Sequence, residues 1–83
     1  MTAQELARLL RNTPVRQLVA ALERDGFVYR RSKGSGRLYR HSDGRRVVIH
    51  YHRGNDTLPH GTLRSVLGSA RWSENDLRRL GLI

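Results

Sequence analysis

The sequence predicts an α+β fold: a three-stranded antiparallel sheet with helices packed on one face. Apolar residues recur at helical spacing before residue 26 and after residue 60. Between them, residues 27–52 are rich in β-branched and aromatic side chains, which favour strands. Eighty-three residues fit a single domain, 1–83, with an N-terminal helical extension over residues 1–12 and a core over residues 14–80.

Two helices are predicted before the strands. Thr2 and Glu5 have the spacing of a capping box, which begins a short helix of about residues 3–11. The second helix spans residues 14–25 and carries an apolar stripe along one side. Its expected N-cap is Thr13, a residue type whose side chain accepts hydrogen bonds from the first turn.

Three strand-like runs follow, at residues 27–31, 37–41 and 46–52. The pair Asp43-Gly44 lies between the second and third runs and is typical of a two-residue hairpin turn. After a loop, two short helices are expected, at about residues 62–67 and from a cap at Ser73 to Leu80.

The hairpin turn also predicts which side chains share a face of the sheet. With Asp43-Gly44 as the turn, Tyr39 pairs with Val48, Arg37 pairs with His50, and side chains alternate between faces. The face expected to meet the helices carries Leu38, Val47, Ile49 and Tyr51. The face expected to meet solvent carries Arg37, Tyr39, His41, Arg46, Val48, His50 and His52.

The positive charge is concentrated in these strands. The chain has a formal net charge of +9, and residues 26–53 contribute eight basic residues against Asp43 alone, a net of +7. Such a surface attracts polyanions, because neutralised phosphates release condensed counterions. The alternative is a generally basic, solvated surface, but that does not explain the clustering. RNA is therefore the expected target.

Composition excludes several classes of protein. There is no cysteine, so neither disulfides nor a cysteine-based zinc site hold the fold together. Two histidines on one strand are a weak metal signal, and no metal or other cofactor is expected. The chain has no membrane-span pattern and no signal-peptide pattern, which predicts a cytoplasmic protein without a membrane partner.

Several short motifs, taken in order, resemble one protein family. They are Leu22-Glu23-Arg24-Asp25-Gly26-Phe27, Lys33-Gly34-Ser35, Leu38-Tyr39-Arg40-His41, Asp43-Gly44-Arg45-Arg46-Val47-Val48, Tyr51-His52 and Gly61-Thr62-Leu63-Arg64-Ser65-Val66-Leu67. Their order and spacing resemble the HicA family of bacterial toxins. The resemblance implies a double-stranded-RNA-binding-domain-like fold, an mRNA endoribonuclease (mRNA interferase) activity without metal, and neutralisation by a HicB-type protein antitoxin.

The chain departs from the family pattern at the expected catalytic position. Family members usually carry a histidine where this chain has Gly36, and commonly a proline where it has His50. Ribonuclease chemistry that starts from the ribose 2′-OH needs a base and an acid, roles that suit histidine and that glycine cannot fill. His50 or His52, on the neighbouring strand, is therefore the candidate for a relocated catalytic base.

Gly36 is also compatible with a protein that does not cleave RNA. Either the domain binds RNA without cutting it, or the glycine is a substitution that disarms a toxin. A further alternative is a protein-interaction domain whose basic face recognises an acidic partner. The residues expected to contact RNA are Arg30, Arg31, Lys33, Arg37, Tyr39 and Arg46. His41 and His60 are expected at the surface without a catalytic role.

Overall fold

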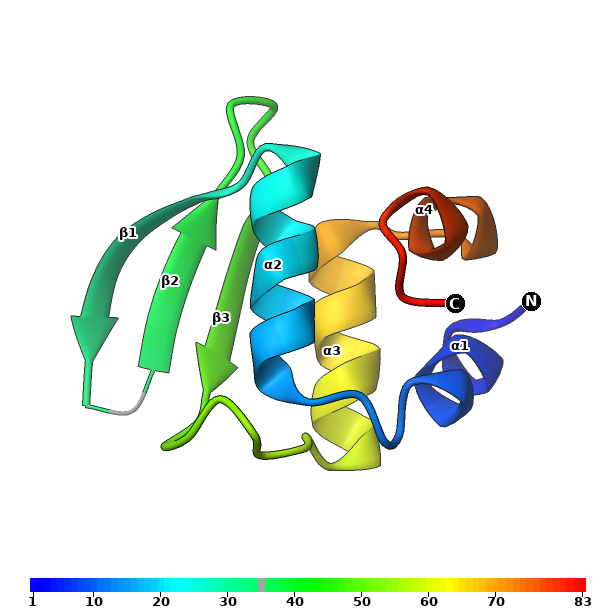
Figure 1. Cartoon of the computed structure of the whole chain (residues 1–83). Helices are drawn as coiled ribbons and strands as arrows, with labels where there is room; N and C mark the ends of the chain where they lie inside the picture. The colour runs from blue at the N-terminus through cyan, green and yellow to red at the C-terminus, as the bar shows by residue number, and fades with distance from the viewer. Residues whose placement is uncertain (35) are drawn as a thin grey trace.

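The described part of the chain folds into four helices and one three-stranded sheet (Figure 1). The computed structural model describes residues 1–34 and 36–83, and for Lys33 it describes the backbone alone. Ser35 of the motif Lys33-Gly34-Ser35 therefore lies outside the described residues. In chain order the elements are α1 (Ala3–Leu9), α2 (Val15–Asp25), β1 (Val28–Lys33), β2 (Gly36–Arg40), β3 (Arg46–His50), α3 (His60–Ala70) and α4 (Glu74–Arg79).

The strands form one antiparallel sheet in the order β1-β2-β3. Helices α2 and α3 lie side by side against one face of this sheet, and α1 and α4 lie on the far side of α3 (Figure 1). None of the described helices covers the other face. The predicted α+β class, with helices on one side of a three-stranded antiparallel sheet, is therefore confirmed.

The predicted caps at Thr2 and Ser73 both form, but the expected cap of α2 does not. Thr2 caps α1 and Ser73 caps α4, and in each case the acid three residues later accepts a hydrogen bond from the backbone N–H of the cap residue. The N-cap of α2 is Pro14, without a side-chain bond, so the prediction of Thr13 was wrong. Instead, the loop before α3 supplies backbone carbonyls to the N–H groups of the first two residues of α2, at 2.8 and 2.9 Å.

The β2–β3 turn has one residue more than predicted. The N–H of His41 donates to the carbonyl of Arg45 at 2.9 Å, and the N–H of Gly44 donates to the carbonyl of His41 at 3.0 Å. Gly44 has a φ of 99°, the left-handed conformation that closes a three-residue hairpin loop. The Asp43 carboxylate accepts from the N–H of Arg45 at 3.1 Å and stabilises this longer loop.

The extra residue shifts the pairing of β2 with β3 by one position. Tyr39 pairs with Val47 and Gly36 pairs with His50, so the predicted pairs Tyr39–Val48 and Arg37–His50 were wrong. A shift of one residue turns every side chain of a strand to the other face. Consequently Tyr39 is buried against the helices, and Leu38 lies on the face that no described helix covers.

Strand β1 pairs irregularly with β2. Its pairing with β2 shifts between Tyr29 and Arg31, which leaves Arg30 as the extra residue of a bulge. Before the bulge, Tyr29 pairs with Tyr39 and their rings meet edge to face with centroids 5.7 Å apart. The Tyr29 side chain is 48% exposed and so lies at the rim of the core.

The core lies between the sheet and the helices. Nineteen apolar residues of the described chain are buried there, including Val47 and Ile49 from β3, Leu18 and Leu22 from α2, and residues from every helix. No polar or charged residue of the described chain is fully buried. The sheet's inner face thus packs against the helices, while no described helix covers its outer face.

Candidate functional site on the open face of the sheet

The outer face of the sheet, here called the open face, is arranged in three cross-strand rows. The pairings align Val28 with Arg40 and Arg46, Arg31 with Leu38 and Val48, and Lys33 with Gly36 and His50. Two residues along a strand span about 6.8 Å, so neighbouring rows are separated by about that distance. Leu38 is partly buried and Gly36 is buried, while the other described side chains in these rows are exposed to solvent.

A hollow of about 230 Å³ lies in the centre of the open face. It is lined by Arg31, Gly36, Leu38, Arg46, Val48 and His50. The side chains of Leu38 and Val48 form its apolar part, while two guanidinium groups and one imidazole supply its polar part. No carboxylate of the described residues lines it, so the hollow suits an anionic ligand that also has an apolar surface.

His50 and Gly36 face each other at one end of the hollow. A Cβ atom built on Gly36 would lie 2.8 Å from Cε1, 3.2 Å from Nδ1 and 3.3 Å from Nε2 of His50. The imidazole ring therefore lies against the backbone of Gly36 and occupies the space that a side chain at position 36 would take. Gly36 is buried by this contact, whereas His50 itself remains exposed.

The structure brings some of the predicted site residues together on the open face. Arg31, Arg46 and His50 line the hollow, and Arg30 lies beside it in a second depression with Val28 and Arg40. Arg40 was not among the predicted site residues, because the predicted register did not place it on the exposed face. The correct length of the hairpin loop was the signal that would have found it.

Two predicted RNA-binding residues lie elsewhere. Tyr39 is 4% exposed, so its predicted place on the solvent face was wrong and its ring has no surface for stacking on a base. Burial raises the pKa of the Tyr39 hydroxyl, and a hydrogen bond with Tyr51 adds to the shift. The Arg37 guanidinium lies 4.2 Å from the centre of the Tyr51 ring and donates to the carbonyl of Tyr51 at 3.0 Å.

His52 lies beyond the end of β3 and does not line the hollow. It is exposed to solvent, as is His60, the first residue of α3. His50 is thus the histidine that the structure places in the hollow. Among the described residues there is no group of three or more side chains able to hold a metal ion.

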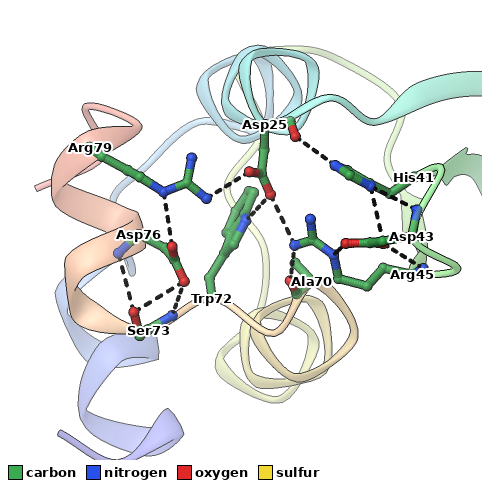
Figure 2. Close-up of polar contacts among 9 residues, drawn as sticks. All are labelled: Asp25, His41, Asp43, Arg45, Ala70, Trp72, Ser73, Asp76 and Arg79. Atoms are coloured by element: carbon green, nitrogen blue, oxygen red, sulfur yellow. Dashed lines mark hydrogen bonds and ion pairs between the residues drawn. The ribbon is translucent and has the colours of Figure 1, made fainter.

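The hairpin loop is attached to the helices by a cluster of polar contacts around Asp25 (Figure 2). The Asp25 carboxylate accepts hydrogen bonds from the indole of Trp72 at 2.9 Å, from Arg45 at 3.0 Å and from Arg79 at 2.6 Å. Its side chain is only 6% exposed. Burial acts to raise the pKa of Asp25, but the three hydrogen bonds outweigh burial and hold the pKa below its usual value.

His41 is part of this cluster rather than a solvated residue at the sheet edge. Its Nε2 donates to the backbone carbonyl of Asp25 at 2.8 Å, and its Nδ1 accepts from the N–H of Asp43 at 3.1 Å (Figure 2). Arg45 also donates to the carbonyl of Ala70 at 2.6 Å. These contacts join the end of α2, the hairpin loop and the end of α3, and so fix the orientation of the strands that carry the open face.

These features define a class of protein: a small, strongly basic α+β domain with an uncovered, arginine-rich sheet face. Residues 15–72, which are 58 of the 83, match the family model described as the HicA toxin of bacterial toxin-antitoxin systems. The chain belongs to the HicA toxin family. Membership in a toxin-antitoxin family implies an antitoxin partner. No curated protein matches the chain. Over the described residues, no helix is both long enough and apolar enough to cross a membrane.

Proposed function

We propose that this protein is a cytoplasmic RNA-binding toxin that cleaves mRNA at the open face and is neutralised by a HicB-type antitoxin. The observation that carries the proposal is the position of His50, whose imidazole lies over Gly36 at the end of a hollow lined by two arginines. The imidazole of His50, on β3, thus occupies the space that a histidine side chain at position 36, on β2, would take.

The proposed reaction needs a base, an acid and cations, of which the open face offers the base and the cations. His50 accepts the proton of the ribose 2′-OH, and the 2′-oxygen attacks the adjacent phosphorus. The bond from phosphorus to the 5′-oxygen breaks, and that oxygen takes a proton from the acid, for which His52 or a water molecule is the candidate. The products are a 2′,3′-cyclic phosphate and a 5′-hydroxyl. Arg31 and Arg46 stabilise the charge that develops on the phosphorus-bound oxygens.

An antitoxin that is acidic at its interface would oppose this function by covering the same charges. The described strands contain no acidic residue, so the open face repels cations and attracts either RNA or an acidic protein surface. We expect RNA and a HicB-type antitoxin to compete for the protein. Arg31→Gln and Arg46→Gln should weaken both interactions.

The test is cleavage of single-stranded RNA by the purified protein in the presence of a chelator. His50→Ala should lower the cleavage rate by about 10²-fold or more, the usual contribution of a general base. His60→Ala is the matched control, because it removes another exposed histidine on α3, and it should leave the rate unchanged. Comparing His52→Ala with His50→Ala shows whether the second histidine takes part.

Gly36 itself favours a second candidate function, RNA binding without cleavage, because glycine stands where the family's histidine is expected. Salt-sensitive RNA binding by a protein that leaves RNA intact would establish this function in place of cleavage. If RNA is cleaved and both His50→Ala and His52→Ala keep full activity, the relocated base is excluded. A gain of cleavage in Gly36→His would instead show a disarmed site.

A further inference from the structure

The hollow of the open face has an apolar part that the proposed cleavage reaction does not use. Leu38 and Val48 are direct cross-strand partners, and Val48 is 50% exposed although it is a large apolar residue. Their row lies between the arginine row of Arg40 and Arg46 and the row of Gly36 and His50. An apolar surface in the middle of a strongly basic face suits a ligand that has both an apolar surface and negative charge.

A double-stranded RNA does not offer that combination. Its outer surface consists of phosphates and ribose hydroxyls, and the faces of its bases are stacked inside the helix. An unpaired nucleotide exposes the flat apolar face of its base while keeping its phosphates. The hollow has a volume of about 230 Å³ and is lined by six residues, a size that suits one base and not a length of duplex.

From these observations we infer that the hollow is a subsite for the base of one unpaired nucleotide, which packs on Leu38 and Val48 while its flanking phosphates contact Arg31 and Arg46. This inference rests on the proposed function and specifies its substrate as single-stranded at the point of contact. Packing on aliphatic side chains uses the face of the base, so it tolerates different bases. The neighbouring row, about 6.8 Å away, places the His50 imidazole at the sugar side of the same nucleotide.

Gly36 contributes to this subsite by its lack of a side chain. The His50 ring lies down on Gly36, with Cε1 2.8 Å from where a Cβ would be. This position keeps the ring at the end of the hollow, beside the Leu38–Val48 row. A larger residue at position 36 would displace the ring from this position.

The test compares RNA binding by two matched variants. Val48→Thr places a hydroxyl in the apolar part of the hollow, and Val28→Thr makes the same change on the open face outside it. Both valines are at least half exposed, at 50% and 55%, so both variants should keep the fold, which circular dichroism and thermal unfolding verify. The probe is a ten-nucleotide RNA with 2′-fluoro riboses, which lack the attacking hydroxyl and therefore stay intact, used alone and annealed to its complement.

We expect the protein to bind the single strand more tightly than the duplex at the same salt concentration. Val48→Thr should weaken binding of the single strand about fivefold, which is near the lower end of the loss in affinity typical of removing a base-stacking contact. Val28→Thr should leave the affinity unchanged. A 2-aminopurine in the probe should fluoresce more strongly when bound, because its base leaves the stack of its neighbours.

The contrary outcomes distinguish failure of the base subsite from failure of the proposed function. Equal binding of single strand and duplex, or equal effects of Val48→Thr and Val28→Thr, would overturn the base subsite while leaving RNA binding by the open face intact. If Val48→Thr weakens the complex with a HicB-type antitoxin but not with RNA, the hollow holds a protein side chain and the inference is wrong. Absence of RNA binding by the unmodified protein would instead contradict the proposed function itself.

Discussion

The imidazole of His50 lies on the backbone of Gly36, its direct partner across the β2–β3 pair, with Cε1 2.8 Å from the position of a Cβ on that glycine. The two positions therefore share one volume. A side chain at position 36 would require the His50 ring to turn away from its present orientation. The identity of residue 36 therefore determines where the His50 imidazole can lie.

Gly36→Ala should reveal this coupling. In the unmodified protein the added methyl group displaces the His50 ring, whereas in a His50→Ala background it meets no ring and should stabilise the strand by about 0.5–1 kcal/mol. The effects of the two substitutions on the free energy of unfolding should thus differ from additivity by about 1 kcal/mol, a typical value for residues in contact. Urea denaturation of the four proteins in this cycle measures it, and additive effects would show that the ring does not rest on Gly36.

The charge of Asp25 should matter for stability. Asp25→Asn removes the negative charge that three donors share and should lower the free energy of unfolding by about 2–3 kcal/mol. Glu23→Gln, the same chemical change at an exposed position of the same helix, should change it by less than about 0.5 kcal/mol. Equal effects of the two variants in urea denaturation would contradict the structural role of the Asp25 cluster.

The lowered pKa of Asp25 also predicts how stability depends on pH. Because the folded protein holds the pKa of this carboxyl below its usual value, the unfolded chain binds its proton more readily. The contribution of Asp25 is therefore fully present above about pH 5 and is lost as the pH falls below about 4. Unfolding measured from pH 7 to pH 3 should show a smaller acid-induced loss in Asp25→Asn than in the unmodified protein. Parallel curves for the two proteins would refute this.

Tyr39 should behave as a core residue. Tyr39→Ala should cost roughly 3–5 kcal/mol, as truncations of buried aromatic residues do, and this change can unfold so small a domain. Tyr29→Ala removes the ring that contacts Tyr39 at the rim and should cost about 1 kcal/mol. Thermal unfolding compares them. A folded Tyr39→Ala variant of normal stability that had lost RNA binding would favour the solvent-facing position that the sequence predicted.

Arginines of the open face should dominate RNA binding. Arg46→Gln should weaken binding to single-stranded RNA and reduce the slope of log affinity against log salt by about 0.7, the value for one phosphate contact on a single strand. Arg64→Gln, which removes an exposed arginine from α3, should do neither. Fluorescence anisotropy over a series of salt concentrations measures both. Equal slopes for the two variants would place the RNA on another surface.

The fold class, the order of the elements and the location of the charge could all be predicted from the sequence. Local signals carry this information: the capping boxes at Thr2 and Ser73, the apolar stripe of α2, and the β-branched residues of β3. They depend on neighbours within a few positions along the chain, so no knowledge of distant contacts is needed. His50 was singled out differently, from the predicted pairing of two strands, which placed it beside the position where the chain departs from the family pattern.

Which face of β2 meets solvent could be learned only from the three-dimensional structure. Turn residues allow both a two-residue and a three-residue hairpin, and the difference of one residue moves Tyr39 into the core and Leu38 onto the open face. The same is true of the role of Asp25, whose carboxylate accepts hydrogen bonds from Trp72, Arg45 and Arg79. Its partners Trp72 and Arg79 lie 47 and 54 residues away, and local sequence patterns carry no information about contacts at that separation.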